Sequence, residues 1–272
     1  MNKKAGHNKL ISLAAAAECV EDGALLAIGG MTLYRRPVAF VRALINRYRQ
    51  TGAPRQLTLL AFTGGFECDL LIGAGMVRQV RSCYFGLESF GFAPMFTYYA
   101  NRGEIEVLEE TEASLSSSLR AQISGVGFIP ARAWLGTDLP RLRPDLRTVT
   151  DPYSGEELMA FPAIQPDVAV IHALQADPDG NADIGRNRSA DEELTLASRQ
   201  VIVTAEEIVP ELTRADLAGP FVSAVVHAPY GAQPSSCHPC YPYDGQAILS
   251  YIEGVSNPES YQAYIESWLS KP

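Results

Sequence analysis

The segment CYFGLESFG, residues 83–91, contains the acidic side chain best placed for chemistry. Glu88 follows an apolar, strand-like stretch and lies between glycines and aromatic residues. A carboxylate among aromatic rings is partly desolvated, which raises its pKa and its strength as a base or nucleophile. The alternative for this pattern is a solvated glutamate in a surface turn. We take Glu88 as the candidate catalytic residue.

Two glycines close an apolar run in the segment IGGMTLYRRP, residues 28–37. Gly29 and Gly30 allow backbone N–H groups to approach an oxygen closely, and the start of a following helix adds a favourable dipole. With Met31, this turn could bind an oxyanion or a phosphate. The spacing matches neither the dinucleotide-binding fingerprint nor the P-loop, and a tight strand-to-helix turn is the alternative.

Charged and glycine residues beside this turn extend the candidate anion site. Arg35 and Arg36 could each hold a carboxylate or phosphate through paired hydrogen bonds, or they could be solvated. A second strand ends in Gly64 and Gly65, so the two turns could share one pocket floor or be unrelated.

A histidine and two cysteines offer further reactive types. His172 follows an apolar, strand-like run and opens the turn-rich segment HALQADPDGNADI, residues 172–184, and such a histidine is typical of a satisfied core residue. Cys237 and Cys240 flank His238 with redox or metal spacing. A zinc site needs four ligands and the chain has no second pair, so we predict no metal site.

These segments require a framework of alternating strands and helices. Strands are expected at residues 24–28, 57–62, 77–85, 105–108, 168–173, 201–205 and 221–227. Helices are expected at residues 9–21, 38–49, 69–74, 94–102, 115–124 and 191–198, with two more after residue 244. The pattern predicts an α/β fold: an open, mostly parallel sheet with helices on both faces, whose ligands bind at the carboxyl ends of the strands.

The alternating elements and the composition predict one globular domain over residues 1–272, with an irregular excursion at about 129–165. The chain has 272 residues, 47% of them hydrophobic and 19% charged, with a net charge of -9 that disfavours nucleic acid as a partner. The polar start, residues 1–8, is not a secretory signal, and no apolar run is long enough for a membrane span. Five scattered cysteines favour reduced thiols and a cytoplasmic location.

Taken together, these segments resemble the α subunit of family I CoA-transferases, closest to the glutaconate CoA-transferase branch. The resemblance covers residues 9–250. It is carried by IGGMTLYRRP, YFGLESFG, LRAQISGVGFIPAR, IHALQADPDGNADI with ADEELTLASRQVIVTAEEIVP, and CHPCYPYDGQAILSYI. Met31 stands where phenylalanine is usual in the family's glycine turn.

The resemblance implies a sheet of the type shared with the NagB and RpiA folds, and a β subunit, often in an α2β2 assembly. The cleft between the subunits would bind acyl-CoA and a carboxylic acid, with coenzyme A as substrate and no tightly bound cofactor. In ping-pong transfer, a glutamate attacks the thioester, and the Gly29–Gly30 turn would stabilise the oxyanion.

One departure leaves the chemistry open. Two-chain members of the family carry the nucleophilic glutamate in a Ser-Glu-Asn-Gly type motif of the β subunit, and this chain has no such motif. Either a partner supplies the nucleophile, or Glu88 acts as an acid or base. The second possibility fits a related branch that opens rings of cyclic CoA thioesters by hydrolysis. A non-catalytic ligand-sensing domain is a third alternative.

Overall fold

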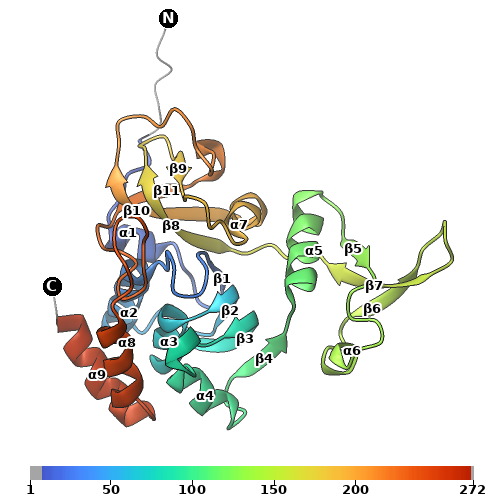
Figure 1. Cartoon of the computed structure of the whole chain (residues 1–272), viewed down its shortest axis with the longest axis horizontal. Helices are drawn as coiled ribbons and strands as arrows, with labels where there is room; N and C mark the ends of the chain where they lie inside the picture. The colour runs from blue at the N-terminus through green and yellow to red at the C-terminus, as the bar shows by residue number, and fades with distance from the viewer. Residues whose placement is uncertain (1–7, 271–272) are drawn as a thin grey trace, which may run out of the picture.

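A computed structural model describes residues 8–270 of the chain (Figure 1). The predicted polar start, apart from Asn8, lies outside these residues. The main sheet contains, in spatial order, β11 (Ala224–His227), β10 (Gln200–Ile208), β8 (Val168–Ala176), β1 (Leu25–Ile28), β2 (Leu57–Gly64), β3 (Val77–Phe85) and β4 (Glu106–Glu109). All neighbours on this path are parallel, and only the short β9 (Ala182–Asp183) pairs antiparallel, with β8.

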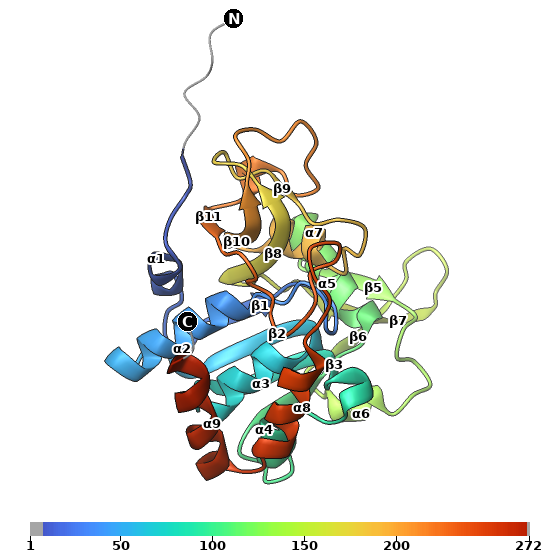
Figure 2. The ribbon, with the colours of Figure 1, turned by 60° about the vertical axis from the view of Figure 1, so that its left-hand side comes forward.

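Helices cover both faces of this sheet, as the apolar strands require. The helices are α1 (Leu13–Glu18), α2 (Val38–Thr51), α3 (Phe66–Gly73), α4 (Pro94–Ala100), α5 (Glu112–Ile123), α7 (Asp191–Ala197), α8 (Gly245–Gly254) and α9 (Pro258–Ser270). One buried cluster joins the sheet to α1, α2, α3, α8 and α9, and a second joins it to α5 and α7. Figure 2 shows α3, α8 and α9 on the opposite side of β2 from α7. The predicted fold class is confirmed.

Element boundaries differ from the expectation in a few places. The expected helix at 9–21 is shorter, and Ser12 caps it by accepting a hydrogen bond from the Ala15 N–H. The strand expected at 221–227 begins later, after a 3-10 turn, η2 (Gly219–Phe221). The two-residue strand β9 was not expected from the turn-rich loop that contains it.

Residues 128–162 form a separate three-stranded antiparallel sheet. Its strands are β5 (Phe128–Ala131), β7 (Glu157–Pro162) and β6 (Arg147–Thr150), with the short helix α6 (Leu139–Leu142) between β5 and β6. Figure 1 shows this sheet beyond α5, set apart from the main sheet. Trp134, Met159 and Phe161 form its own buried cluster, which explains how so short a sheet is ordered.

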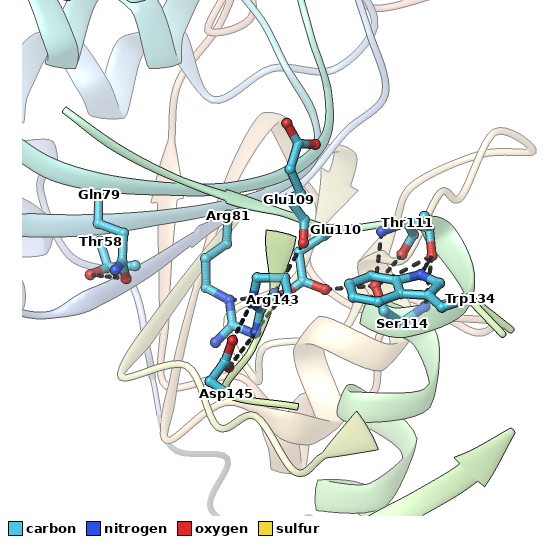
Figure 3. Close-up of polar contacts among 10 residues, drawn as sticks. All are labelled: Thr58, Gln79, Arg81, Glu109, Glu110, Thr111, Ser114, Trp134, Arg143 and Asp145. Carbon is cyan, nitrogen blue, oxygen red and sulfur yellow. Dashed lines mark hydrogen bonds and ion pairs between the residues drawn. The ribbon is translucent and has the colours of Figure 1, made fainter. Parts of the chain in front are cut away.

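Buried Glu110 connects the small sheet to the main sheet (Figure 3). Its carboxylate accepts hydrogen bonds from Arg81 on β3, from Arg143 after α6 and from Ser114 on α5. Trp134 donates from its indole to Thr111, the cap of α5. A buried carboxylate with three such donors is fully satisfied, and it fixes the excursion to β4 and α5.

Asp69 connects the helices that pack beneath the ends of β2 and β3. This buried carboxylate of α3 accepts hydrogen bonds from the Met95 and Phe96 amides of α4 and from the Tyr251 hydroxyl of α8. Burial raises the pKa of Asp69 to about 6, although these three donors act in the opposite direction.

We predict that the stability contributed by Asp69 decreases as the pH rises. A raised native-state pKa favours the protonated folded state, so the contribution is complete below about pH 4 and is lost as the pH passes about 6. Urea unfolding at pH 4 to 7 should show the wild-type protein losing up to about 3 kcal/mol relative to Asp69→Asn, which does not titrate. A difference that stays constant or grows with pH would contradict this assignment.

Candidate active-site edge

Three neighbouring strands end at one edge of the sheet, where the predicted site residues lie. β1 leads into residues 29–37, β2 ends at Gly64, and β3 leads into η1 (Glu88–Phe90). Because β1, β2 and β3 are parallel and adjacent, their carboxyl-terminal loops open on the same side. The fold therefore brings together the three segments that sequence patterns selected.

Glu88 is exposed at this edge and has a left-handed backbone with φ of 54°. Two backbone hydrogen bonds close its turn: the Phe90 N–H donates to the Leu87 carbonyl, and the Gly91 N–H donates to the Glu88 carbonyl. The Tyr84 hydroxyl accepts a further bond from the Glu88 N–H. A non-glycine residue in this conformation is strained, and such strain concentrates at functional positions. The turn presents the carboxylate outward from the end of β3.

Aromatic rings do not partly desolvate Glu88 as predicted, and its exposure fits the alternative, a glutamate in a surface turn. Phe85 stacks on Phe96 with ring centroids 4.1 Å apart, and Phe90 packs edge-on against Tyr243. Phe92 is itself 81% exposed. The Phe85 and Phe90 rings pack against α4 and against the loop before α8 rather than around the carboxylate. Any desolvation of Glu88 therefore requires another molecule.

Gly29 and Gly30 are buried, and their N–H groups are already used. Gly29 donates to the Val170 carbonyl of β8, and Gly30 donates to the Asp191 carboxylate at 2.8 Å. The predicted oxyanion site at these two amides is therefore wrong. Gly30 is needed for the backbone, since φ is 80° and a Cβ would lie 2.5 Å from the Arg35 carbonyl oxygen.

Arg35 is buried rather than available to a substrate. Its guanidinium donates to the carbonyl oxygens of His172 and Asn187 at 2.7 and 2.6 Å and to the Asp191 carboxylate at 2.7 Å. Burial raises the pKa of Asp191, and the charge of Arg35 opposes that effect. Arg35 was predicted to hold a substrate carboxylate or phosphate, but the carboxylate that it binds is Asp191 on α7 of the same chain.

Arg36 is also buried, and it pairs with Glu67 at the start of α3. The distance from Arg36 Nη2 to Glu67 Oε1 is 2.5 Å, and neither side chain is exposed. Burial is the largest single influence and would lower the pKa of Arg36, but the charge and hydrogen bond of Glu67, together with the charges of Cys68 and Asp191, raise the pKa overall. The prediction that Arg36 binds a substrate anion is therefore wrong for this chain. Sequence reasoning missed Glu67, although an acid within the apolar run FECDLLIG was a signal that a buried partner exists.

Gly64, Gly65 and Met31 occupy different surroundings at the same edge. A Cβ on Gly64 would lie 2.5 Å from the Phe85 ring, so this glycine permits close packing between β2 and β3. Gly65 faces oxygen atoms of Thr32 and Glu67. Met31 is 40% exposed. Of the predicted binding residues, Met31 is the one whose side chain reaches solvent.

His172 belongs to a buried hydrogen-bond network behind this edge. Its ring nitrogens contact Thr204 at 2.8 Å and Glu206 at 2.7 Å, and Glu206 also accepts bonds from the Tyr230 amide and the Tyr241 hydroxyl. Burial lowers the pKa of His172. Burial would raise the pKa of Glu206, but the hydrogen bonds that it accepts from His172, Tyr241 and Tyr230 together lower that pKa. The predicted role of His172 as a satisfied core residue is confirmed.

Cys237 lies beside this network, and with His172 and Glu206 it offers three metal-ligand types whose atoms lie within 4.8 Å of one another. Both nitrogens of His172 already have hydrogen-bond partners, and burial raises the pKa of the Cys237 thiol. The group is therefore satisfied as a polar network, with the thiol in its neutral form.

A cleft of about 550 Å³ opens beside the Arg35 loop. Tyr34, Leu174, Arg186 and His238 line it, and Arg186 is exposed. The cleft lies near the carboxyl end of β8, where this fold class binds ligands.

A family model described as coenzyme A transferase matches residues 10–227, which is most of the chain. The chain belongs to the coenzyme A transferase family. A 3-oxoadipate CoA-transferase subunit from Pseudomonas knackmussii is 32% identical over 96% of this chain and 93% of its own. The cholesterol ring-cleaving hydrolase IpdA subunit of Rhodococcus jostii is 32% identical over 97% of this chain and 92% of its own.

The fold agrees with solved members of the same family. The crystal structure of glutaconate coenzyme A-transferase from Acidaminococcus fermentans superposes with a TM-score of 0.87, at 30% identity over 96% of this chain and 88% of that one. The predicted family is confirmed. The two curated relatives, one a transferase and one a hydrolase, are equally similar, so overall identity does not choose between their reactions. No helix within residues 8–270 has the length and apolarity to cross a membrane.

We predict that Arg35→Met destabilises the protein by about 3–5 kcal/mol, because it leaves the buried Asp191 carboxylate without its cation. Arg186→Met, at an exposed position, is the matched control and should change stability by less than about 0.5 kcal/mol. Urea unfolding of both variants measures the difference. Equal stabilities would show that the Arg35–Asp191 pair is dispensable.

Proposed function

We propose that this chain is the α subunit of a heteromeric CoA-transferase that moves CoA between an acyl-CoA and a carboxylic acid. The observation that carries the proposal is the coenzyme A transferase match over residues 10–227, on a fold whose strand-end edge leaves the Glu88 turn exposed. A β subunit would cover this edge and contribute the second half of the site. A cytoplasmic α2β2 assembly without a tightly bound cofactor is part of the proposal.

The transfer proceeds through two covalent intermediates on a glutamate side chain. The carboxylate attacks the thioester carbon, the C–S bond breaks, and an acyl-glutamyl anhydride and CoA thiolate form. The thiolate then attacks the glutamyl carbonyl, which releases the first acid and leaves a glutamyl-CoA thioester. The acceptor acid reverses both steps. The absence of a Ser-Glu-Asn-Gly type motif from this chain favours a nucleophile in the partner.

The surroundings of Gly29 and Gly30 also favour a partner. The carbonyl oxygen becomes negative during each attack and requires hydrogen-bond donors. In this chain both glycine amides are committed to Val170 and Asp191. In the proposed assembly, donors for the oxyanion come from other amides of the strand-end loops or from the β subunit.

A second candidate is ring-opening hydrolysis of a cyclic CoA thioester, and Glu88 is the observation that favours it. Transfer as written moves no proton to or from water, whereas hydrolysis must deprotonate a water molecule. An exposed carboxylate on this chain supplies such a base, and a hydrolase subunit is among the relatives. The two reactions therefore differ in what they require of Glu88.

We predict that co-expression of this chain with its β subunit yields an enzyme that moves labelled CoA to an acceptor acid. Borohydride should trap a glutamyl-CoA thioester, because that intermediate carries a reducible acyl group, and mass spectrometry should find it on the β chain. Ring opening in the absence of an acceptor, with no trapped adduct, would support the hydrolase instead. Turnover by this chain alone would contradict both two-subunit proposals.

We predict that Glu88→Gln lowers kcat of the assembled transferase by less than about tenfold, since the carboxylate holds no proton in that cycle. A hydrolase would lose about 10²- to 10⁴-fold with its general base. Glu253→Gln, an exposed acid on α8, is the control and should leave kcat unchanged. Full ring-opening activity of the Glu88 variant would show that Glu88 is not the base of a hydrolase, and a loss of transferase kcat well beyond tenfold would contradict its minor role in transfer.

A further inference from the structure

The cleft beside the Arg35 loop has walls that are fixed by hydrogen bonds within the chain. The turn after β1, the end of β8, the loop after β9 and the loop before α8 meet there. The Tyr34 hydroxyl donates to the His238 carbonyl oxygen at 3.0 Å, and Arg35 donates to the Asn187 carbonyl oxygen at 2.6 Å. The Arg35 N–H also donates to the Ser236 carbonyl oxygen at 2.8 Å. The cleft is therefore preformed, and its volume of about 550 Å³ is typical of a small-molecule site.

The polar side chains left available in this cleft offer hydrogen-bond donors. Arg186 and Asn187 are exposed, and neither side chain bonds to any residue between 8 and 270. The same holds for the exposed His238 ring, which carries an N–H donor in either protonation state. Asn187 and His238 use only their carbonyl oxygens in the walls, so all three side chains can contact a ligand.

The lining of the cleft carries positive charge and no negative charge. None of the described residues that line it is acidic, although the chain as a whole has a net charge of -9. The acids Glu192 and Asp216, which follow in the sequence, are paired with Arg188 rather than with Arg186. A guanidinium without a carboxylate partner attracts a carboxylate or a phosphate, which it can bind through two parallel hydrogen bonds.

The remaining walls are apolar, and they indicate a ligand with a carbon skeleton. Leu174, Pro239 and the ring of Tyr34 line the cleft beside the donors. An inorganic ion would use the donors and leave this apolar surface in water. An organic anion covers the apolar walls as well, which adds the hydrophobic contribution to its binding.

The cleft adjoins the strand-end edge that contains Glu88. Met31 and Tyr34 exchange two backbone hydrogen bonds, so the exposed Met31 and one wall of the cleft belong to the same turn. The cleft opens at the end of β8, and β1 and β2 lie between β8 and β3. Three strand spacings place the cleft about 14 Å from the end of β3. A ligand anchored in the cleft can therefore extend along the edge toward the Glu88 turn.

We propose that Arg186, with Asn187 and His238, binds an anionic group of an organic substrate in this cleft, at a distance from the reacting centre. This inference rests on the proposed function, in which two kinds of substrate carry such a group. Coenzyme A carries phosphates, and an acyl group or acceptor acid with a second carboxylate carries it at the far end. The shared chemistry is an oxyanion attached to a carbon skeleton, and the experiment separates the two sources.

Two substitutions of Arg186 test the site. Arg186→Gln removes the charge and keeps a polar side chain, and Arg186→Lys keeps the charge without the paired donors. Arg78→Gln is the matched control, because Arg78 is also exposed and has no bonded partner in the described chain, but lies at the opposite end of β3. Thermal unfolding of the assembled enzyme verifies that all three variants are folded.

Calorimetry on the assembly with the β subunit compares each anionic probe with a relative that lacks the anion. Coenzyme A is compared with pantetheine, and glutarate is compared with pentanoate. If the bound group is a phosphate, Arg186→Gln weakens coenzyme A by about tenfold or more and leaves glutarate unchanged. If the bound group is a carboxylate, glutarate weakens by that factor and coenzyme A is unchanged. Arg186→Lys should lose less affinity than Arg186→Gln, and pantetheine and pentanoate should bind all variants equally.

Wild-type affinity of Arg186→Gln for both coenzyme A and glutarate would overturn the anion site, even if the assembly transfers CoA. An equal loss in Arg78→Gln would also overturn it, since the effect would then follow from overall charge. An assembly whose affinity for either anion depends on Arg186, but which moves CoA to no acid and opens no ring, would refute the proposed function and leave the anion site supported.

Discussion

The burial of two consecutive arginine charges constrains the whole strand-end edge of this protein. A buried guanidinium is tolerated only with a carboxylate and further acceptors. Arg35 has a left-handed backbone with φ of 52°, and the two side chains go to different parts of the fold: Arg35 to Asp191 on α7 and Arg36 to Glu67 on α3. The loop after β1 is thereby fixed between α7 and α3, two helices that follow different strands of the sheet.

This arrangement separates structural charges from those available for chemistry. The arginines, Asp191 and the His172–Glu206 network are engaged within the chain, and the amides of Gly29 and Gly30 are used in the same way. Among the described residues at this edge, the side chains of Glu88 and Met31 are exposed to solvent. An edge that exposes Glu88 while the amides of Gly29 and Gly30 are engaged within the chain agrees with a site completed by a second subunit.

The sequence predicted the framework because its signals are local. Apolar runs such as residues 168–173 and glycine turns after them are readable without knowing what lies opposite, and they placed Glu88 at a strand end. Arg35 and Arg36 are paired with carboxylates 156 and 31 positions away in the sequence, and residue type alone does not reveal such partners. The sequence therefore suggested a substrate site where the fold has internal ion pairs. Likewise, the aromatics around Glu88 are neighbours in sequence, but their rings pack on α4 and Tyr243.

The central claim is that another polypeptide covers the strand-end edge around Glu88. Amide hydrogen exchange of residues 84–93, compared between this chain alone and its complex with the β subunit, tests that claim most directly. Exchange here reports on solvent access to the η1 turn and its few backbone hydrogen bonds. We expect strong slowing of exchange in the complex, and unchanged exchange in a complex that is catalytically active would contradict the account.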